Sequence, residues 1–382
     1  MPTPTSQLTD LEYLILEKEQ ATGWAERDAT ATAHGIPLMD GEYGVELDDP
    51  IREQPITTGD ANATWLEQDE RRLQGTLRIP LYPAKAKTIL DWALLRTSNE
   101  LDSYTGTHVS PDVETRRHFG LKPDRMRIEG AQKGDVVASL DLVGRYETKV
   151  GSAPAAPTMP TIEAFTFAQG RFLLSLDGGS TEIEPEAIEG FNLELANNLD
   201  RGPNKEDRAD DDKSMSINWL LAGKPEISGS VTALWDRAAY GDMQRGKLQG
   251  SFRMVLGHKG GDSATVGVGG AAAGSTVSVL VDSSAGFSVD EVVRFESSAG
   301  VLKCGGKISA IADGTHITIT TLEKALVSGD LVYGKALSLY VPRIYCSGVP
   351  KRRARSQRVR VTLNFRGFAD VGQSLIEYIA EG

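Results

Sequence analysis

One unit of sequence occurs twice in this chain, and this repetition restricts the possible folds more than any motif does. Asp40 to Pro55 (DGEYGVELDDPIREQP) resembles Ile188 to Pro203 (IEGFNLELANNLDRGP), since both place an aromatic residue before Glu-Leu and a polar break. Leu73 to Leu81 (LQGTLRIPL) resembles Ile227 to Trp235 (ISGSVTALW). The chain is therefore expected to hold two related domains in tandem.

A third pair of segments extends the repeat and shows the structural class. Leu121 to Tyr146 parallels Leu339 to Phe368, and each ends in a long alternating segment closed by glycine and an aromatic residue. Alternation of apolar and polar residues is typical of half-buried strands. The sequence therefore predicts a mainly β protein with strands at Leu77–Tyr82, Arg125–Glu129, Val136–Tyr146, Phe165–Leu176, Glu189–Leu195, Ile227–Leu234, Leu248–Leu256, Leu337–Tyr345 and Val359–Phe368.

Helical patterns are few. Pro83 to Arg96 has proline in the first turn and an apolar i, i+4 stripe, which predicts a helix that flanks the first domain. A weaker pattern predicts a matching helix at Asp236 to Gln244, and a short one is expected at Gly372 to Ala380. Each β domain is thus expected to carry one flanking helix.

Composition shifts along the chain predict the domain boundaries. A Gly, Ser, Ala and Pro-rich stretch at 151–160 reads as a linker after a first domain at 1–150. The second domain is predicted at 161–260 and 334–382, interrupted by a small inserted β-domain at 261–333 with its own short strands. Such an insertion is expected in a surface loop, on the outside of any assembly.

Charge and cysteine content exclude several classes of protein. The chain has 382 residues with 41 Lys and Arg against 53 Asp and Glu, a net charge of −12, which argues against affinity for nucleic acid. Its two cysteines, Cys304 and Cys346, exclude a disulfide framework or a thiolate zinc cluster and are expected to be buried and reduced. The N-terminal residues have no pattern of a signal peptide, and no long apolar stretch predicts a membrane span.

No catalytic or cofactor constellation is visible. Gly267, Gly269 and Ala272 satisfy a relaxed dinucleotide fingerprint, but a strand is predicted after them where that site needs a helix. The histidines lack metal-ligand spacing, and no serine lies in a nucleophile elbow. We expect no cofactor, no metal and no enzymatic activity.

Two runs of opposite charge lie between predicted strands of the second half. The acidic run has carboxylates that could hold a divalent cation, but the spacing of a calcium loop is missing, so a solvated loop is favoured. The basic run fits a solvated hairpin or a contact with an acidic surface of another subunit. These runs supply the candidate contacts between subunits: Glu206, Asp207, Asp210, Asp211 and Asp212 with Lys351, Arg352, Arg353 and Arg355.

The order of these segments resembles a known family. YLILEKEQATGWA followed by HGIPLMDGEYGVELDDPIREQPI is similar to the start of tail tube proteins of long-tailed, siphovirus-type bacteriophages. FNLELANNLD, PEISGSVTALWDRAAY, LYVPRI and VRVTLNFRGFAD resemble the tube domain of the same family. The resemblance covers nearly the whole chain apart from the insertion.

The resemblance implies a β-sandwich or barrel fold with a flanking helix, whose subunits join strands into rings that stack into a tube for the genome. Two tube domains in each chain then imply homotrimeric rings with pseudo-sixfold symmetry. The implied partners are further copies of the chain, the tape measure, tail terminator and tail-tip proteins, and double-stranded DNA that passes without specific binding. The protein is expected in the virion tail after assembly in the host bacterial cytoplasm.

Elementary physics favours the same assembly. Ring closure removes the exposed edge strands of open sheets, and a closed ring grows only along its axis. An acidic lumen would repel DNA rather than hold it. The alternatives are a secreted carbohydrate-binding or adhesin-type β-sandwich protein, which the missing signal peptide disfavours, and an enzyme that uses a pair of acidic residues.

Overall fold

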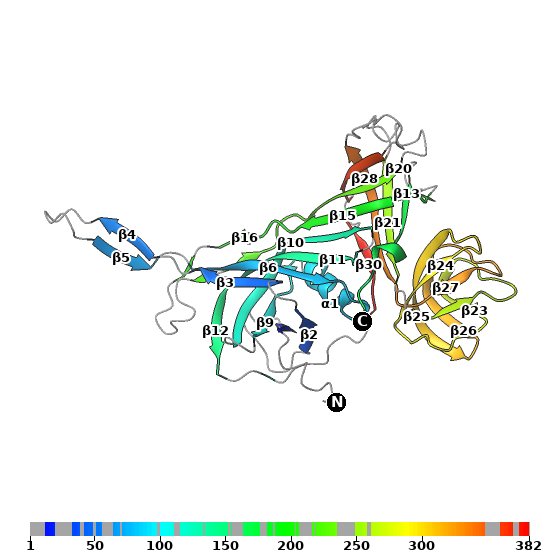
Figure 1. The fold of residues 1–382 in the computed structure, drawn as a ribbon, viewed down its shortest axis with the longest axis horizontal. Helices are drawn as coiled ribbons and strands as arrows, with labels where there is room; N and C mark the ends of the chain where they lie inside the picture. Colours follow the sequence, from blue (N-terminus) through cyan, green and yellow to red (C-terminus); the bar gives the residue numbers. More distant parts are fainter. Residues whose placement is uncertain are drawn as a thin grey trace, which may run out of the picture.

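The chain folds mainly into β-strands, which form several antiparallel sheets (Figure 1). The computed structural model describes residues 12–19, 33–38, 42–48, 51–55, 64–68, 71–97, 100–110, 115–132, 134–151, 154, 163–175, 182–185, 188–202, 204–205, 216–217, 219–234, 249–257, 261–347, 360–369 and 374–381. Sixteen of the described strands belong to one large sheet, to which each half of the chain contributes eight.

The first half pairs its eight strands in the order β2-β1-β9-β10-β11-β6-β3, with β12 added on β10. The bounds are β1 Tyr13–Lys18, β2 Ala33–Pro37, β3 Tyr43–Asp48, β6 Arg72–Pro80, β9 Tyr104–Val109, β10 Thr115–Ala131, β11 Val137–Gly144 and β12 Tyr146–Val150. Short pairs lie outside this sheet, namely β4 Ile51–Pro55 with β5 Thr64–Gln68 and β7 Arg96–Thr97 with β8 Glu100–Leu101.

The second half pairs its eight strands in the order β14-β13-β21-β28-β29-β20-β15, with β30 added on β28. The bounds are β13 Arg171–Ser175, β14 Glu182–Ile183, β15 Ile188–Ala196, β20 Glu226–Leu234, β21 Gly250–Leu256, β28 Leu337–Ser347, β29 Arg360–Gly367 and β30 Glu377–Ile379. Between β15 and β20 lie two short pairs, β16 Asp200–Arg201 with β19 Leu220–Leu221 and β17 Asn204–Lys205 with β18 Ser216–Ile217.

The two halves therefore follow one pairing order, and within the large sheet one strand pairing joins them. Strand β10 of the first half pairs antiparallel with β15 of the second half, which makes the path continuous from β14 to β3. That path is open, with no closed barrel among the described strands. The arrangement is a β-sandwich-type fold, as the alternating segments predict.

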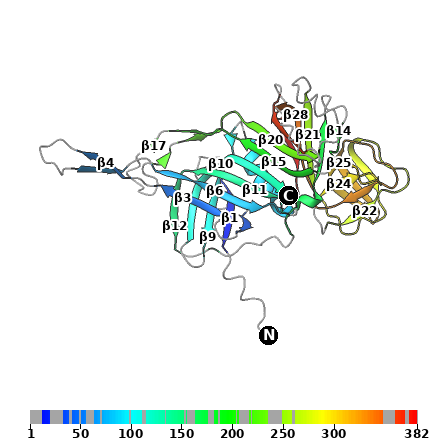
Figure 2. The same cartoon turned by 45° about the horizontal axis from the view of Figure 1, so that its top comes forward.

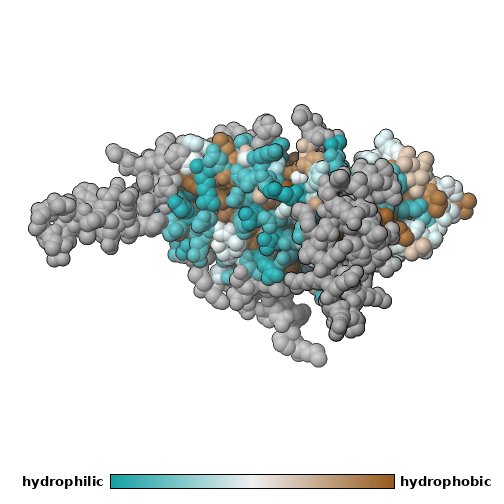
Figure 3. Space-filling model, turned by 90° about the horizontal axis from the view of Figure 1, so that it is seen from above, coloured by the Kyte–Doolittle hydropathy of each residue, from teal (hydrophilic) through white to brown (hydrophobic). Residues whose placement is uncertain are grey.

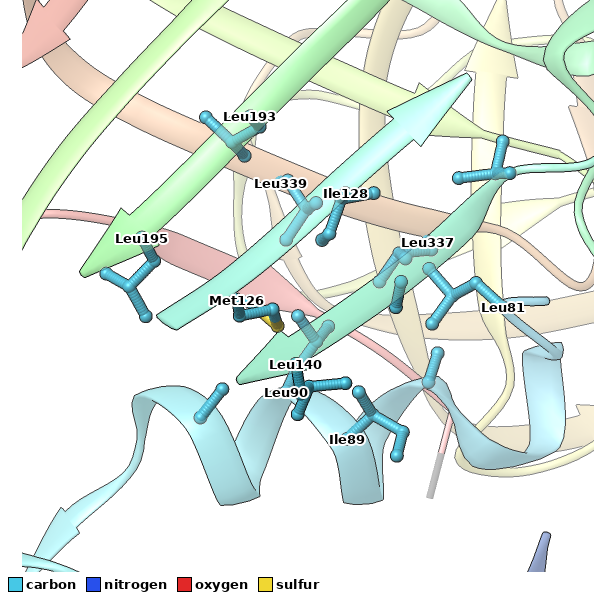
Figure 4. Packing of buried hydrophobic residues seen from close by; sticks show 14 of the residues in the cluster. Leu81, Ile89, Leu90, Met126, Ile128, Leu140, Leu193, Leu195, Leu337 and Leu339 are labelled. Carbon is cyan, nitrogen blue, oxygen red and sulfur yellow. The ribbon is translucent and has the colours of Figure 1, made fainter. Parts of the chain in front are cut away.

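One hydrophobic core runs through both halves. Helix α1 (Pro83–Leu94) begins at its proline and buries Ile89, Leu90 and Trp92 against the sheet. Figure 4 shows Leu90 under Leu140 of β11, with Leu193 of β15 on the same side of the sheet. The opposite faces of these strands carry polar side chains, which predominate in the middle of the molecule as seen from above (Figure 3).

Residues 261–333 contribute a separate sheet of six strands, ordered β22-β27-β24-β25-β26-β23. This inserted sheet has a core of its own, which includes Phe295, Ile308 and Ile319, and it lies at one end of the molecule (Figures 1 and 2). Arg253 of β21 pairs with Glu323 at 2.7 Å and so ties the insertion to the second half. The bounds are β22 Ser263–Thr265, β23 Gly274–Leu280, β24 Val292–Glu296, β25 Leu302–Asp313, β26 His316–Leu322 and β27 Leu331–Tyr333.

The structure confirms most predicted elements and corrects two. The predicted helix at Gly372 to Ala380 is wrong, because Glu377–Ile379 form β30 and pair with β28. The predicted strand from Phe165 to Leu176 is broken, since Phe167–Gln169 form a short 3-10 helix before β13. In the first case strand pairing with a distant partner outweighs a weak local preference.

Candidate assembly interface

The predicted ring-stacking residues cannot be located. Residues 206–215 and 348–359 lie outside the described part of the chain, and these ranges include every member of the acidic and basic runs. The predicted helix at Asp236 to Gln244 and most of the predicted linker at 151–160 also lie outside it. The interface is therefore built here from strand edges and the surfaces beside them.

The junction between β10 and β15 is the interface that the chain makes with itself. On the core side, Met126 lies opposite Leu195 and Ile128 opposite Leu193, and all four side chains are buried. Burial of such side chains contributes roughly 1.5–3 kcal/mol each. The junction is therefore held chiefly by its apolar face.

The solvent side of the same junction carries an ion-pair group. Glu194 forms an ion pair with Arg125 at 3.4 Å and accepts a hydrogen bond from Arg127 at 3.1 Å. Both arginines are substantially exposed, so each pair contributes only about 0–1 kcal/mol. These pairs add little stability but help to fix the register between β10 and β15. A shift of β15 by one residue would move Glu194 to the opposite face of the sheet from the two arginines.

A buried asparagine fixes one end of the junction. The Asn197 backbone N–H donates to the Asp124 carbonyl at 2.7 Å. Its side-chain Nδ2 donates to the carbonyls of Pro123 at 2.9 Å and Ala93 at 3.0 Å. The Asn197 side chain thus links both strands of the junction to the end of α1.

The connection between β15 and β20 folds back over the first half of the chain. We call the described residues of this connection, 200–202, 204–205, 216–217 and 219–221, the second arm. Its Ile217 and Leu220 are buried against Val143 of β11. The Lys122 ammonium, itself buried, donates to the Leu220 carbonyl at 2.8 Å, and burial lowers the pKa of Lys122 more than the Glu100 carboxylate raises it. The second arm therefore covers the solvent side of β10 and β11 around Lys122 and Val143.

The corresponding connection between β3 and β6 contains the hairpin β4–β5, which we call the first arm. It projects away from the body of the molecule (Figures 1 and 2). Among the described strands, β3 pairs with β6 alone, so its other edge is open. An open edge beside a projecting hairpin is a surface that can accept another chain.

A polar cluster lies under this open edge. The Tyr43 hydroxyl and His118 Nδ1 are 2.8 Å apart, and His118 Nε2 lies 3.3 Å from Glu147. Burial raises the pKa of Tyr43 well above its usual value, and burial lowers that of His108 more than Glu12 raises it. A cavity of about 390 Å³ opens beside this cluster. The cluster holds β3 in place from below, through the hydrogen bond between Tyr43 and His118.

The described residues offer no metal centre, since no group of three His, Cys, Asp or Glu side chains among them could hold an ion. Cys304 and Cys346 are buried and unpaired, and burial raises the pKa of each thiol to about 11. Gly269 and Gly270 form a turn that leads into β23, so the relaxed dinucleotide fingerprint is not followed by a helix. No described helix is long and apolar enough to cross a membrane.

Comparison with known families agrees with this architecture. The family model described as phage tail tube protein matches residues 15–320. The match covers most of the chain, so the chain belongs to the phage tail tube protein family, whose members are structural components of the virion tail. No curated protein matches the chain.

Proposed function

We propose that the chain is a tandem of two tube domains, and that three copies close a ring of six such domains. The supporting observation is the shared pairing order of the two halves, which extends to the register. Tyr43 of β3 lies opposite Leu77 of β6, and Phe191 of β15 lies opposite Val231 of β20. These are equivalent positions in the repeat that the sequence predicts.

Ring closure follows from the difference between β3 and β15. The β15 strand has a partner on each side, whereas its equivalent β3 has β6 alone among the described strands. In the proposed ring, β3 of each chain pairs with the C-terminal end of β28 of a neighbouring chain, as β15 pairs with β10. The ring pairs the open edge of each β3, and the same interface recurs around it.

The proposed rings stack into a tail tube that conducts the double-stranded genome to the host. The polar faces of β6, β11, β10 and β15 are proposed to line the lumen, where Glu194 neutralises arginines that could otherwise hold DNA. The tape measure, tail terminator and tail-tip proteins are the proposed partners at the ends of the tube. Catalysis has no part in this function, and assembly takes place in the host cytoplasm.

The proposal includes the domain boundaries: a first domain at 1–150, a linker at 151–160, a second domain at 161–260 and 334–382, and an insertion at 261–333. The inserted sheet is placed on the outside of the ring, because it packs against β21 and β13 at one end of the sheet, away from the β3 edge. It therefore does not block the proposed contact between neighbouring chains.

Electron microscopy of the purified chain tests the function directly. The expected result is rings or tubes whose averages show a wall of six domains with three additional lobes outside. A preparation that stays monomeric at high concentration, or rings without a threefold arrangement, would contradict the proposal.

Contacts between stacked rings are proposed to come from the two charge runs. Exposed pairs contribute about 0–1 kcal/mol each, but they repeat around every ring and along the tube. Opposite charges on the two rims also set polarity, because a reversed ring would bring like charges together.

Replacing Lys351, Arg352 and Arg353 by glutamate is therefore expected to leave the subunit folded and its rings intact, but to weaken stacking. A reciprocal change of Asp210, Asp211 and Asp212 to lysine is expected to restore it. Sedimentation at low and high salt measures the effect, since screening weakens exposed pairs. Tubes that are indifferent to salt and to the swap would contradict this contact, and loss of single rings would instead place the basic run between neighbours within a ring.

A further inference from the structure

We propose that the first arm of one chain docks on the solvent side of β28, β29 and β20 of a second copy, in the same way that the second arm docks on the first half of its own chain. This inference rests on the proposed ring and assigns to it a specific contact. It is argued from the contacts that the second arm already makes.

The two arms occupy equivalent places and share a sequence signature. Each arm connects the strands at the equivalent positions β3 and β6 or β15 and β20. Trp219 and Leu220 follow Trp65 and Leu66 by 154 residues, the same offset that separates Ile227 from Leu73 (227 − 73 = 154). The Trp-Leu pair is therefore at the same distance before the following strand in both arms.

The surface that receives the second arm is a row of three residues across three strands, which we call the first seat. Lys122 of β10 pairs with Val143 of β11, and Val143 pairs with Gln74 of β6. Leu220 is only 2% exposed at this place, and Arg201 donates to Gln74 at 3.3 Å. The row is covered because the second arm lies on it.

The second half presents the equivalent row, which we call the second seat. Tyr345 of β28 pairs with Arg366 of β29, and Arg366 pairs with Ser228 of β20. Tyr345 is 44% exposed, although Lys122 at the equivalent position is 5% exposed. A hollow of about 290 Å³ is lined by Ser228 and Arg366, among others. Among the described residues, the second seat is therefore open, whereas the first seat is covered.

The direction of the arms requires a second copy as occupant. The second arm leaves β15 toward β10, that is, away from β20. The first arm projects from the end of the sheet at β3 and β6 (Figure 1), and beyond the free edge of β3 the described part of this chain has no further strand. Its own second seat lies on the far side of β6, β11, β10 and β15, several strand spacings of about 4.8 Å away. Only another chain at the β3 edge can bring a second seat to this arm.

Cysteine pairs test the contact in the full-length protein. Leu66→Cys with Arg366→Cys, treated with a short bismaleimide, is expected to give covalent dimers and trimers on a denaturing gel. The internal control is Val143→Cys with Leu220→Cys. These two cysteines should be cross-linked within one chain, because the two native side chains pack together. The negative control is Leu66→Cys with Val268→Cys, since Val268 is 87% exposed in a turn of the insertion and belongs to neither seat.

A substitution in the arm provides a second measurement. Leu66→Asp is expected to raise the protein concentration needed for ring formation about tenfold or more, as expected when the burial of one leucine is lost. The melting temperature of the unassembled chain should not change. Normal ring formation by this variant would overturn the arm contact. So would rings in which the cysteines of the Leu66→Cys and Arg366→Cys protein stay unlinked. Either result would leave the proposed function unaffected. Absence of rings from the wild-type chain would overturn both.

Discussion

Replacing Trp92 by alanine is expected to lower the free energy of unfolding by about 3–5 kcal/mol, the usual cost of removing a large aromatic side chain from a core. Trp92 is fully buried on α1, and its ring packs 5.3 Å from that of Tyr104. Its Nε1 also donates to the Leu121 carbonyl at 3.1 Å, so the substitution leaves a buried acceptor without this partner. Urea denaturation followed by circular dichroism measures the loss.

Trp92→Phe separates the two contributions. It keeps most of the apolar bulk but removes the indole N–H donor. The expected loss of unfolding free energy is about 1–3 kcal/mol, because the buried Leu121 carbonyl loses this hydrogen bond. Equal losses for the alanine and phenylalanine variants would show that packing at this position matters little. A loss below 1 kcal/mol for alanine would contradict the role of α1 as a main support of the sheet.

Replacing Gly75 by alanine is expected to destabilise the first half by about 3 kcal/mol, at the upper end of the usual range for overpacking, and to abolish ring formation. A Cβ atom at Gly75 would lie 1.9 Å from the Gly44 carbonyl oxygen and 2.5 Å from the Val45 Cα. Both obstacles belong to the backbone of β3, so no rotamer change relieves the clash. The β3 strand must therefore move away from β6. This movement also displaces the free edge of β3, which the proposed ring uses.

Gly44→Ala is the matched control on the facing strand. A Cβ atom at Gly44 meets only the Thr76 hydroxyl at 4.0 Å, and neither glycine has a positive φ. The expected change in unfolding free energy is therefore within about 1 kcal/mol, since alanine also reduces the entropy of the unfolded chain. Sedimentation of both variants tests assembly. Normal rings from Gly75→Ala would show that the β3 edge is not an assembly surface.

The candidate interface was only partly accessible to sequence reasoning. The charge runs were visible as composition, but Lys122 and Asn197 were not, because a buried lysine or asparagine cannot be told from an exposed one without its partners. The repeated pair Trp65-Leu66 and Trp219-Leu220 was the available signal for the arms. Its meaning depends on the burial of Leu220 against Val143, which is a contact between residues far apart in the chain.

The sequence by itself determined the local elements of this protein. Alternation indicated strands such as β11 and β20, and the proline and apolar stripe indicated α1, because side-chain period and turn chemistry are properties of neighbouring residues. Tertiary structure decided which strands meet. It made Glu377–Ile379 a strand on β28 and joined the halves through β10 and β15. A strand edge accepts any partner whose register buries its apolar face, so only the folded chain selects the partner and, among the described strands, leaves one edge of β3 open.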